Sequence, residues 1–189
     1  MTITLGIIAD THIPDRMPRL HAGVLPAFRR AGVRAILHAG DVCVPRVLRE
    51  LETVAPVFAV QGNRDWISLR HLPASLILEF DGVKIGLAHG HGGLRRYLLE
   101  KLHNSLYGLK EEKYVDYMLS FFPGVDVIVF GHVHRIVNQR LGGKLVFDPG
   151  SACYAEDIEK GPTVGLLNIY EQGQVDAEVV YLNIASVGF

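Results

Sequence analysis

Apolar residues of this chain gather in short runs, each ended by glycine or polar residues. Three runs open the chain, Ile3–Ala9, Arg34–His38 and Val57–Val60, and their near-continuous hydrophobicity is typical of strands covered on both faces. Between them, Val24–Ala31 and Arg46–Thr53 have the pattern of helices. This alternation predicts an α/β domain whose opening sheet is largely parallel.

The later runs predict antiparallel pairs. Ser75–Phe80 and Val83–Ala88 flank Asp81-Gly82, a dipeptide that favours a tight hairpin turn. Two further pairs follow, 136–141 with 144–148 about Gly142-Gly143, and 163–170 with 175–182 about Gly173.

Residues 93–122 interrupt this order. Leu94, Leu98 and Leu102 recur at helical spacing, and a second helix is predicted from Tyr114 to Phe122, after Gly108. Packing of both helices on the sheet is the first interpretation, and a lid or a dimer surface beside the functional site is the other. Because the chain has no repeat, linker or low-complexity tract, we expect a single domain, 1–189, with a two-helix insert at about 93–122.

Composition narrows the class of protein. With 189 residues, 49% of them hydrophobic, the chain can bury a full core. Its formal net charge of −1 lacks the basic excess of a nucleic-acid binder, so we do not expect a nucleic-acid partner. Cys43 and Cys153 have no metal-type spacing, and no apolar run suits a signal peptide or a membrane span. We therefore expect a cytoplasmic protein without a membrane partner.

The chemistry is concentrated where strands end. The run Val125–Val129 leads into Phe130-Gly131, and His132 and His134 follow. Residues i and i+2 of an extended segment project to the same side, so both imidazoles can face one point, and imidazole is a common metal ligand near neutral pH. Other donor residues follow other predicted strands in the same way. The full set is Asp10, His12, Asp41, Asn63, His89, His132 and His134.

Seven donors exceed the needs of one four-coordinate ion but suit two ions that share a bridging carboxylate. The carboxyl ends of strands in α/β sheets are where ligands bind. Two divalent ions with two aspartates and one hydroxide leave a centre near +1, which would attract a phosphate diester. Four of these residues also have a simpler interpretation: Asp10 could be a helix N-cap or form a turn, Asn63 could form a turn, Asp41 could cap a helix near Pro45, and His89 could be a loop histidine. The hypothesis that all of these simpler interpretations hold together, at successive strand ends, is the weaker one.

The motifs resemble those of the calcineurin-like metallophosphoesterases, and the small single-domain YfcE-like phosphodiesterases most of all. The resemblance covers essentially the whole chain and rests on five motifs in order, with Asp148-Pro149-Gly150-Ser151 in addition. The five motifs are Asp10-Thr11-His12, Gly40-Asp41, Gly62-Asn63-Arg64-Asp65, His89-Gly90-His91 and Gly131-His132-Val133-His134.

This resemblance implies a four-layer α/β/β/α sandwich of two mixed sheets flanked by helices, with the metal site at the C-terminal ends of the strands. It implies two divalent transition-metal ions with Asp41 as the bridge. The donors suit manganese first, and also iron, nickel or zinc. The implied ligands are Asp10, His12, Asp41 and His134 for one ion, and Asp41, Asn63, His89 and His132 for the other.

The implied activity is hydrolysis of a small phosphodiester by a metal-bridging hydroxide that attacks phosphorus in line. Arg64 stands where many relatives have a histidine or a cysteine, so we expect it to clamp phosphate oxygens rather than to donate a proton. A surface ion pair is the alternative for Arg64. His91 is a candidate general acid or a partner of the site, Asp65 is expected to orient a ligand or Arg64, and His38 is expected to be a satisfied strand-end histidine.

Departures from the family pattern limit what the resemblance implies. Asp148 replaces the usual asparagine, and the segment after Ser151 lacks the Pro-Arg often found there. The 93–122 insert is longer than in many relatives, which favours small diesters over polynucleotides. Three alternatives stay open: a non-catalytic scaffold like the related retromer subunit, a phosphomonoesterase, and a DNA nuclease. Homo-oligomers are also compatible with the sequence.

Overall fold

Two five-stranded mixed sheets face each other in the computed structural model, which describes residues 2–93, 111–153 and 161–182. The first has the order β10 (Val175–Tyr181), β9 (Thr163–Ile169), β1 (Ile3–Ile8), β2 (Ala35–His38), β3 (Val57–Ala59). The second has the order β4 (Ser75–Phe80), β5 (Val83–Ala88), β6 (Val127–Val129), β8 (Lys144–Pro149), β7 (Ile136–Leu141). In the first sheet β1 pairs in parallel with β2 and antiparallel with β9, and in the second β5 pairs in parallel with β6 and antiparallel with β4.

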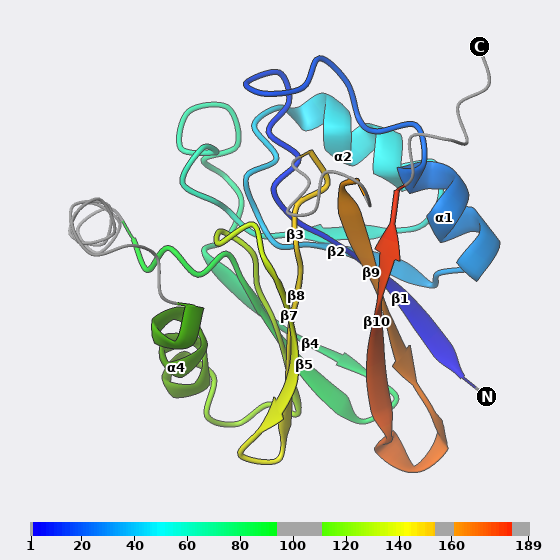
Figure 1. Cartoon of the computed structure of the whole chain (residues 1–189), viewed down its shortest axis with the longest axis vertical. Helices are drawn as coiled ribbons and strands as arrows, with labels where there is room; N and C mark the ends of the chain where they lie inside the picture. Colours follow the sequence, from blue (N-terminus) through cyan, green and yellow to red (C-terminus); the bar gives the residue numbers. More distant parts are fainter. Residues whose placement is uncertain (1, 94–110, 154–160, 183–189) are drawn as a thin grey trace.

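Helices cover the outer faces of both sheets. Figure 1 shows α1 (Val24–Ala31) and α2 (Pro45–Glu52) beside the first sheet and α4 (Glu111–Phe121) beside the second. A short 3₁₀ turn, η1 (Glu171–Gly173), joins β9 to β10. The arrangement confirms the four-layer α/β/β/α sandwich. None of the described helices has the length and hydrophobicity that crossing a membrane requires.

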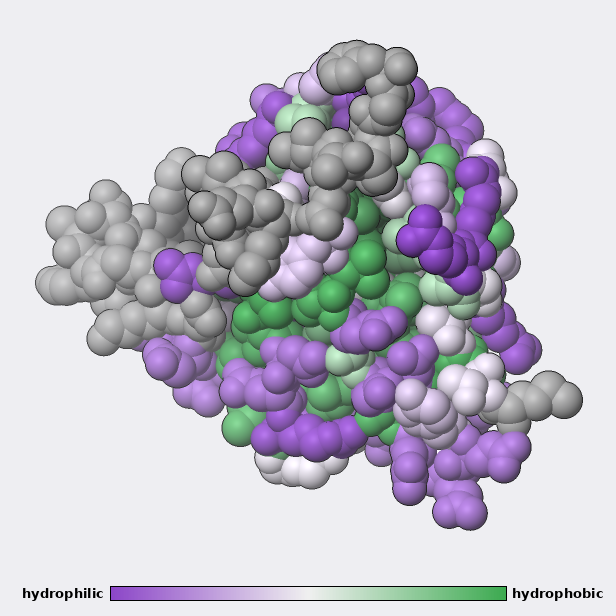
Figure 2. All heavy atoms as spheres, turned by 45° about the vertical axis from the view of Figure 1, so that its right-hand side comes forward, coloured by the Kyte–Doolittle hydropathy of each residue, from purple (hydrophilic) through white to green (hydrophobic). Residues whose placement is uncertain are grey.

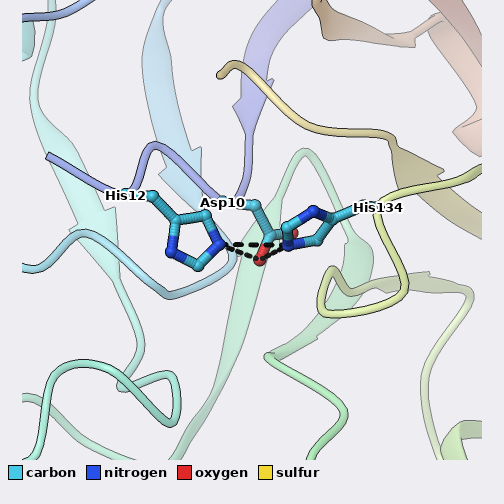
Figure 3. Close-up of side chains that lie close together, drawn as sticks. All are labelled: Asp10, His12 and His134. Carbon is cyan, nitrogen blue, oxygen red and sulfur yellow. Dashed lines mark hydrogen bonds and ion pairs between the residues drawn. The ribbon is translucent and has the colours of Figure 1, made fainter. Parts of the chain in front are cut away.

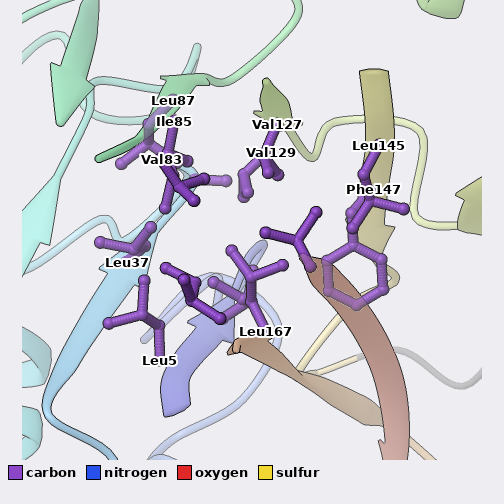
Figure 4. Close-up of a cluster of buried hydrophobic side chains, with 14 of the residues drawn as sticks. Leu5, Leu37, Val83, Ile85, Leu87, Val127, Val129, Leu145, Phe147 and Leu167 are labelled. Carbon is purple, nitrogen blue, oxygen red and sulfur yellow. The ribbon is translucent and has the colours of Figure 1, made fainter. Parts of the chain in front are cut away.

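The two-residue period of the strands builds the layers. Leu5 and Leu37 point between the sheets, where they meet Val127 and other residues of the second sheet (Figure 4). Their neighbour Ile36 points the other way, into the cluster under α1 and α2, and Ile128 points into the cluster under α4. Three apolar layers therefore separate four layers of secondary structure.

The expected elements agree with the observed ones, apart from the insert, to within two residues at either end. Asp81 and Gly82 both have positive φ, as the predicted hairpin turn requires. In the insert, α4 begins at Glu111, three residues before the expected start at Tyr114, and Tyr114 and Met118 pack on the second sheet. The expected helix around residues 94–106 lies outside the described residues.

One face of the molecule has hydrophobic side chains at its centre and hydrophilic ones around them (Figure 2). At the edge of the first sheet, Ala177, Val179 and Val180 of β10 are only half-buried. The apolar interior is therefore incompletely covered by the described residues at this edge.

Candidate metal centre

The loops that follow β1, β2, β3, β5 and β6 meet at one end of the sandwich. The backbone N–H of Asp10 donates to the carbonyl of Gly40 at 3.0 Å, which joins the first two loops. The backbone N–H of His132 donates to Oδ2 of Asp10 at 2.9 Å, and this bond links the two sheets. The sandwich therefore brings together donor residues that are more than 120 positions apart in the sequence.

Asp10, His12 and His134 form a first group of ligand atoms (Figure 3). Nε2 of His134 lies 3.2 Å and Nε2 of His12 3.6 Å from Oδ1 of Asp10, and the two Nε2 atoms are 3.0 Å apart. Oδ1 of Asp10 is buried and has no hydrogen-bond partner among the described residues. One carboxylate oxygen and two imidazole nitrogens thus converge on one point, as ligands of a divalent transition metal do.

Asp10, Asp41 and His89 form a second group. Nδ1 of His89 donates to the carbonyl of Ala39 at 2.7 Å, so Nε2 carries the lone pair that a metal needs. Nε2 lies 3.5 Å from Oδ1 of Asp41 and 3.1 Å from Oδ1 of Asn63. The described residues therefore bring Asn63 to the same point as the second group.

Asp41, a member of the second group, also approaches the first. Its Oδ2 is 3.6 Å from Nε2 of His12, while its Oδ1 faces His89. The alternative interpretation of Asp41 as a helix cap is wrong, because Val44 precedes α2 and no side chain caps that helix. Asp41 is free to face the centre with both oxygens.

Burial and charge act in opposite directions on these groups. Burial raises the pKa of Asp10, but the imidazoles of His12 and His134 outweigh it and hold this pKa well below its usual value. Burial also raises the pKa of Asp41, and here burial prevails. Burial lowers the pKa of His132 to about 3, so this imidazole is neutral at physiological pH. Burial lowers the pKa of His89 as well, but the carboxylates of Asp41 and Asp10 outweigh it and raise this pKa above its usual value. Within the centre, His132 therefore has the neutral form in which imidazole binds metals.

The backbone at the centre is unusual. Left-handed conformations, which side-chain-bearing residues rarely adopt, occur at five of the seven expected ligands. Their φ angles lie between 46° and 77°. Strain of this kind is concentrated at functional sites, where surrounding structure enforces it. The five residues are Asp10, His12, Asp41, His132 and His134.

Asp65 holds the loop that carries Asp41. Its carboxylate accepts the backbone N–H groups of Asp41 at 2.9 Å, Gly62 at 2.8 Å and Cys43 at 2.7 Å. Asp65 thus fixes the backbone of an expected ligand, Asp41, in keeping with the prediction that it orients a ligand or Arg64.

His38 is also a supporting residue. Its Nδ1 accepts the N–H of Gly40 at 3.2 Å, which leaves its Nε2–H to donate to the hydroxyl of Thr11 at 3.2 Å. Burial lowers the pKa of His38 to about 3 and keeps it neutral. The prediction of a satisfied strand-end histidine is confirmed.

Three expected site residues lie around the two groups rather than in them. His132 belongs to neither, and its ring packs edge-on against His89 with 5.0 Å between centroids. Arg64 is exposed, its backbone N–H donates to Oδ1 of Asp41 at 2.8 Å, and no carboxylate of the described residues forms an ion pair with it. His91 is 7% exposed, with its ring 6.0 Å from that of Trp66.

The sequence patterns did not indicate two further contacts. Nη1 of Arg16 lies 3.4 Å from Nδ1 of His134, and the hydroxyl of Ser151 donates to the backbone carbonyl of Asp10 at 2.9 Å. Arg16 sits in a loop without periodicity, so no pattern singled it out. Ser151 was part of a family motif, but its partner could be found only in three dimensions.

A third group, His12, Asp15 and Cys43, adjoins the first. Burial raises the pKa of the Cys43 thiol, whose Sγ lies 3.9 Å from Oδ2 of Asp15. Since a thiol binds metals only as the thiolate, Cys43 is a poor ligand in this setting.

Comparisons with known proteins agree with this geometry. Residues 3–172 match the model of the calcineurin-like phosphoesterase superfamily domain. The chain is 35% identical to a probable metallophosphoesterase of Methanothermobacter thermautotrophicus, over 93% of this chain and 91% of that one. It is 28% identical to a phosphodiesterase of Methanocaldococcus jannaschii, over 87% of this chain and 92% of that one.

Among solved structures, Vps29 of Entamoeba histolytica in complex with zinc superposes with a TM-score of 0.67 and 24% identity. The superposition covers 96% of this chain and all of that one. At this identity the likeness shows a shared fold.

Proposed function

Because the chain belongs to the calcineurin-like phosphoesterase superfamily, we propose that it is a metal-dependent hydrolase of small phosphodiesters. The observation that carries the proposal is the convergence of Oδ1 of Asp10 with Nε2 of His12 and His134, within 3.6 Å of that oxygen. A buried carboxylate oxygen without a hydrogen-bond donor is costly unless a cation satisfies it. A phosphodiesterase among the relatives supports the diester as substrate.

The proposal includes two ions, with Asp41 between them. The support is that the two oxygens of Asp41 face different histidines, His12 and His89. Manganese is the first candidate, and iron, nickel and zinc suit the same mixed donors. The residues that would hold the ions are Asp10, His12, Asp41 and His134 for one, and Asp41, Asn63, His89 and His132 for the other.

Bound divalent ions supply Lewis acidity, which activates water and offsets charge on the phosphoryl group. The chain itself supplies cationic side chains at the rim. Arg64 is exposed but anchored through its backbone to Asp41, so its guanidinium can reach a phosphate beside the centre. Arg16 approaches from the opposite loop, next to His134.

No expected residue supplies an acidic proton readily. Arg64 stays charged in proteins, and burial lowers the pKa of His91 to about 4, so His91 is neutral at physiological pH. We therefore propose that the enzyme favours substrates whose leaving group departs without protonation.

The test begins with protein freed of metal by chelation and reloaded with manganese. Bis-p-nitrophenyl phosphate should be hydrolysed faster than p-nitrophenyl phosphate or a single-stranded oligonucleotide. Asp41→Asn should abolish turnover, while Asp126→Asn, a matched change at an exposed carboxylate that accepts the N–H of Lys84, should not. Full activity of Asp41→Asn would contradict the bridge.

Metal binding without turnover of any of these substrates would instead favour the scaffold. The fold shared with Vps29 is compatible with that second candidate, but the seven intact donor residues favour an enzyme.

A further inference from the structure

A cavity of about 310 Å³ opens beside the metal centre, between the loop after β3, the loop after β5 and helix α4. This size lies at the lower end of the range for small-molecule sites. The described residues that line it include His89, which also belongs to the second ligand group. A phosphate at the centre would thus have this cavity as its neighbour.

The walls of the cavity are aromatic. Trp66 comes from the loop after β3, and Tyr117 and Phe121 come from one side of α4, with 5.7 Å between their ring centroids. Ala74 and Ala88 complete the apolar lining. Flat apolar walls of this kind favour stacking of a planar ring.

The described part of the lining carries no Asp, Glu, Lys or Arg. From these residues a second phosphate would gain no cation to offset its lost hydration. An uncharged group meets no such penalty.

His91, one of the lining residues, has a buried ring nitrogen. Nδ1 of His91 is buried and has no hydrogen-bond partner among the described residues, although His91 lines the cavity. A buried polar atom of this kind is costly until something bonds to it. Because this nitrogen is closed to solvent, the affinity of the cavity for a ring depends on its aromatic walls rather than on His91.

We propose that this cavity binds the organic arm of the substrate, and that this arm carries an uncharged planar aromatic ring, such as an aryl group or a nucleobase. The inference rests on the proposed function and deepens it by naming the substrate class. Trp66, Tyr117 and Phe121 are then the residues that determine specificity for the arm.

The first experiment measures binding without turnover. Trp66 is the only tryptophan of the chain, so its fluorescence reports directly on the cavity. Manganese-loaded protein is titrated with phenylphosphonate and with methylphosphonate, which share a head group and differ in the ring. Phenylphosphonate should quench Trp66 and bind about tenfold more tightly, since stacking on aromatic side chains contributes that much or more. Equal affinity for the two phosphonates would overturn the proposal.

Variants assign the preference to the cavity. Phe121, 44% exposed, can be changed to Ala with little risk to folding, and Phe121→Ala should reduce the phenyl-over-methyl preference severalfold. Trp66→Phe keeps a ring and should retain most of the phenyl-over-methyl preference, whereas Trp66→Ala should lose this preference. Because both variants lack the fluorescent reporter, the affinities of the two phosphonates are measured by inhibition of bis-p-nitrophenyl phosphate hydrolysis. Ile67→Ala is the control, because Ile67 is 89% exposed and not part of the lining. An unchanged preference in both Phe121→Ala and Trp66→Ala would overturn the assignment.

Failure of this inference can be told apart from failure of the proposed function. Hydrolysis of diesters without preference for the ring would overturn the aromatic cavity and leave the phosphodiesterase intact. Ring-selective quenching of Trp66 in a protein that hydrolyses no phosphoester would support the cavity and overturn the phosphodiesterase.

Discussion

Asp65 accepts the backbone N–H of Asp41 at 2.9 Å, so one buried carboxylate fixes the position of another. The same Oδ2 accepts the N–H of Gly62 at 2.8 Å, and Oδ1 accepts that of Cys43 at 2.7 Å. Asp65 therefore joins the loops after β2 and β3 at the point where Asp41 turns toward the metal centre.

Asp65→Asn should weaken metal binding while leaving every expected ligand in place. An amide NH₂ would face backbone N–H groups that need an acceptor, and leaving such groups unsatisfied costs about 1–3 kcal/mol each. Changes to residues that orient ligands lower metal affinity about 10- to 100-fold. Isothermal titration with manganese measures the loss, and Asp126→Asn is the control. Wild-type affinity in Asp65→Asn would contradict the supporting role.

Gly62→Ala should damage the site through one methyl group. A Cβ at this position would overlap the backbone N and Oδ1 of Asp41. Forcing extra volume into a packed site costs about 1–3 kcal/mol, and here the displaced atom is an expected ligand. Gly124→Ala is the matched control, because a Cβ there meets nothing within 4 Å, and it should change stability by no more than about 0.5 kcal/mol. Urea unfolding and metal titration measure the free energy of unfolding and the metal affinity of both variants. Equal values for Gly62→Ala and Gly124→Ala would refute the expected clash.

Arg64→Ala should chiefly raise KM, by about 10- to 100-fold if the guanidinium makes charge-assisted hydrogen bonds to phosphate oxygens. Turnover at saturation should change less, because Arg64 supplies no proton. Arg16→Ala tests the opposite side of the site and should raise KM by a smaller factor. Steady-state kinetics with bis-p-nitrophenyl phosphate separate the two parameters. An unchanged KM in Arg64→Ala would remove the clamp.

The metal-free protein should lose stability in acid partly through His38. Its pKa is about 3 in the folded protein and near 6.5 in the unfolded chain. Between these values the unfolded chain binds a proton that the folded protein excludes, so the free energy of unfolding falls as pH falls from about 6.5 toward 3. The slope from one such group is at most about 1.4 kcal/mol per pH unit.

His38→Gln should therefore be less stable than wild type at neutral pH, but its stability should depend less on pH below about 6. Urea unfolding of chelated protein at several pH values measures both. His71→Gln, at an exposed histidine, is the control and should keep the wild-type slope. A His38→Gln slope equal to that of wild type would show that His38 does not contribute.

Local patterns in the sequence were sufficient to predict the described strands and helices, and they singled out the candidate ligands. The hairpin at Asp81-Gly82 was predictable because its turn needs positive φ at neighbouring residues, which this dipeptide tolerates. His89 and His134 were predictable as candidate ligands because each follows a buried strand, and the carboxyl ends of such strands meet.

Relations across the fold were not predictable in this way. The position of Asp65 in its motif did not reveal which N–H groups it accepts, since these come from two loops. Nor did any spacing indicate that Trp66 and Phe121 would line one cavity, because a loop and a helix from different layers supply them. The packing of His132 against His89 likewise could be found only once β5 and β6 were known to be neighbours in the second sheet.

The left-handed backbone lowers the stability of the fold at the same residues that the proposed activity needs. These residues are Asp10, His12, Asp41, His132 and His134. Each such residue costs about 1–3 kcal/mol, a penalty that glycine would largely avoid. Glycine at one of these positions would thus relax the chain while removing a side chain the proposed catalyst needs. Selection for thermostability alone, in the absence of metal, is therefore expected to replace these imidazoles and carboxylates first. The product would be a more stable protein of the same fold without activity.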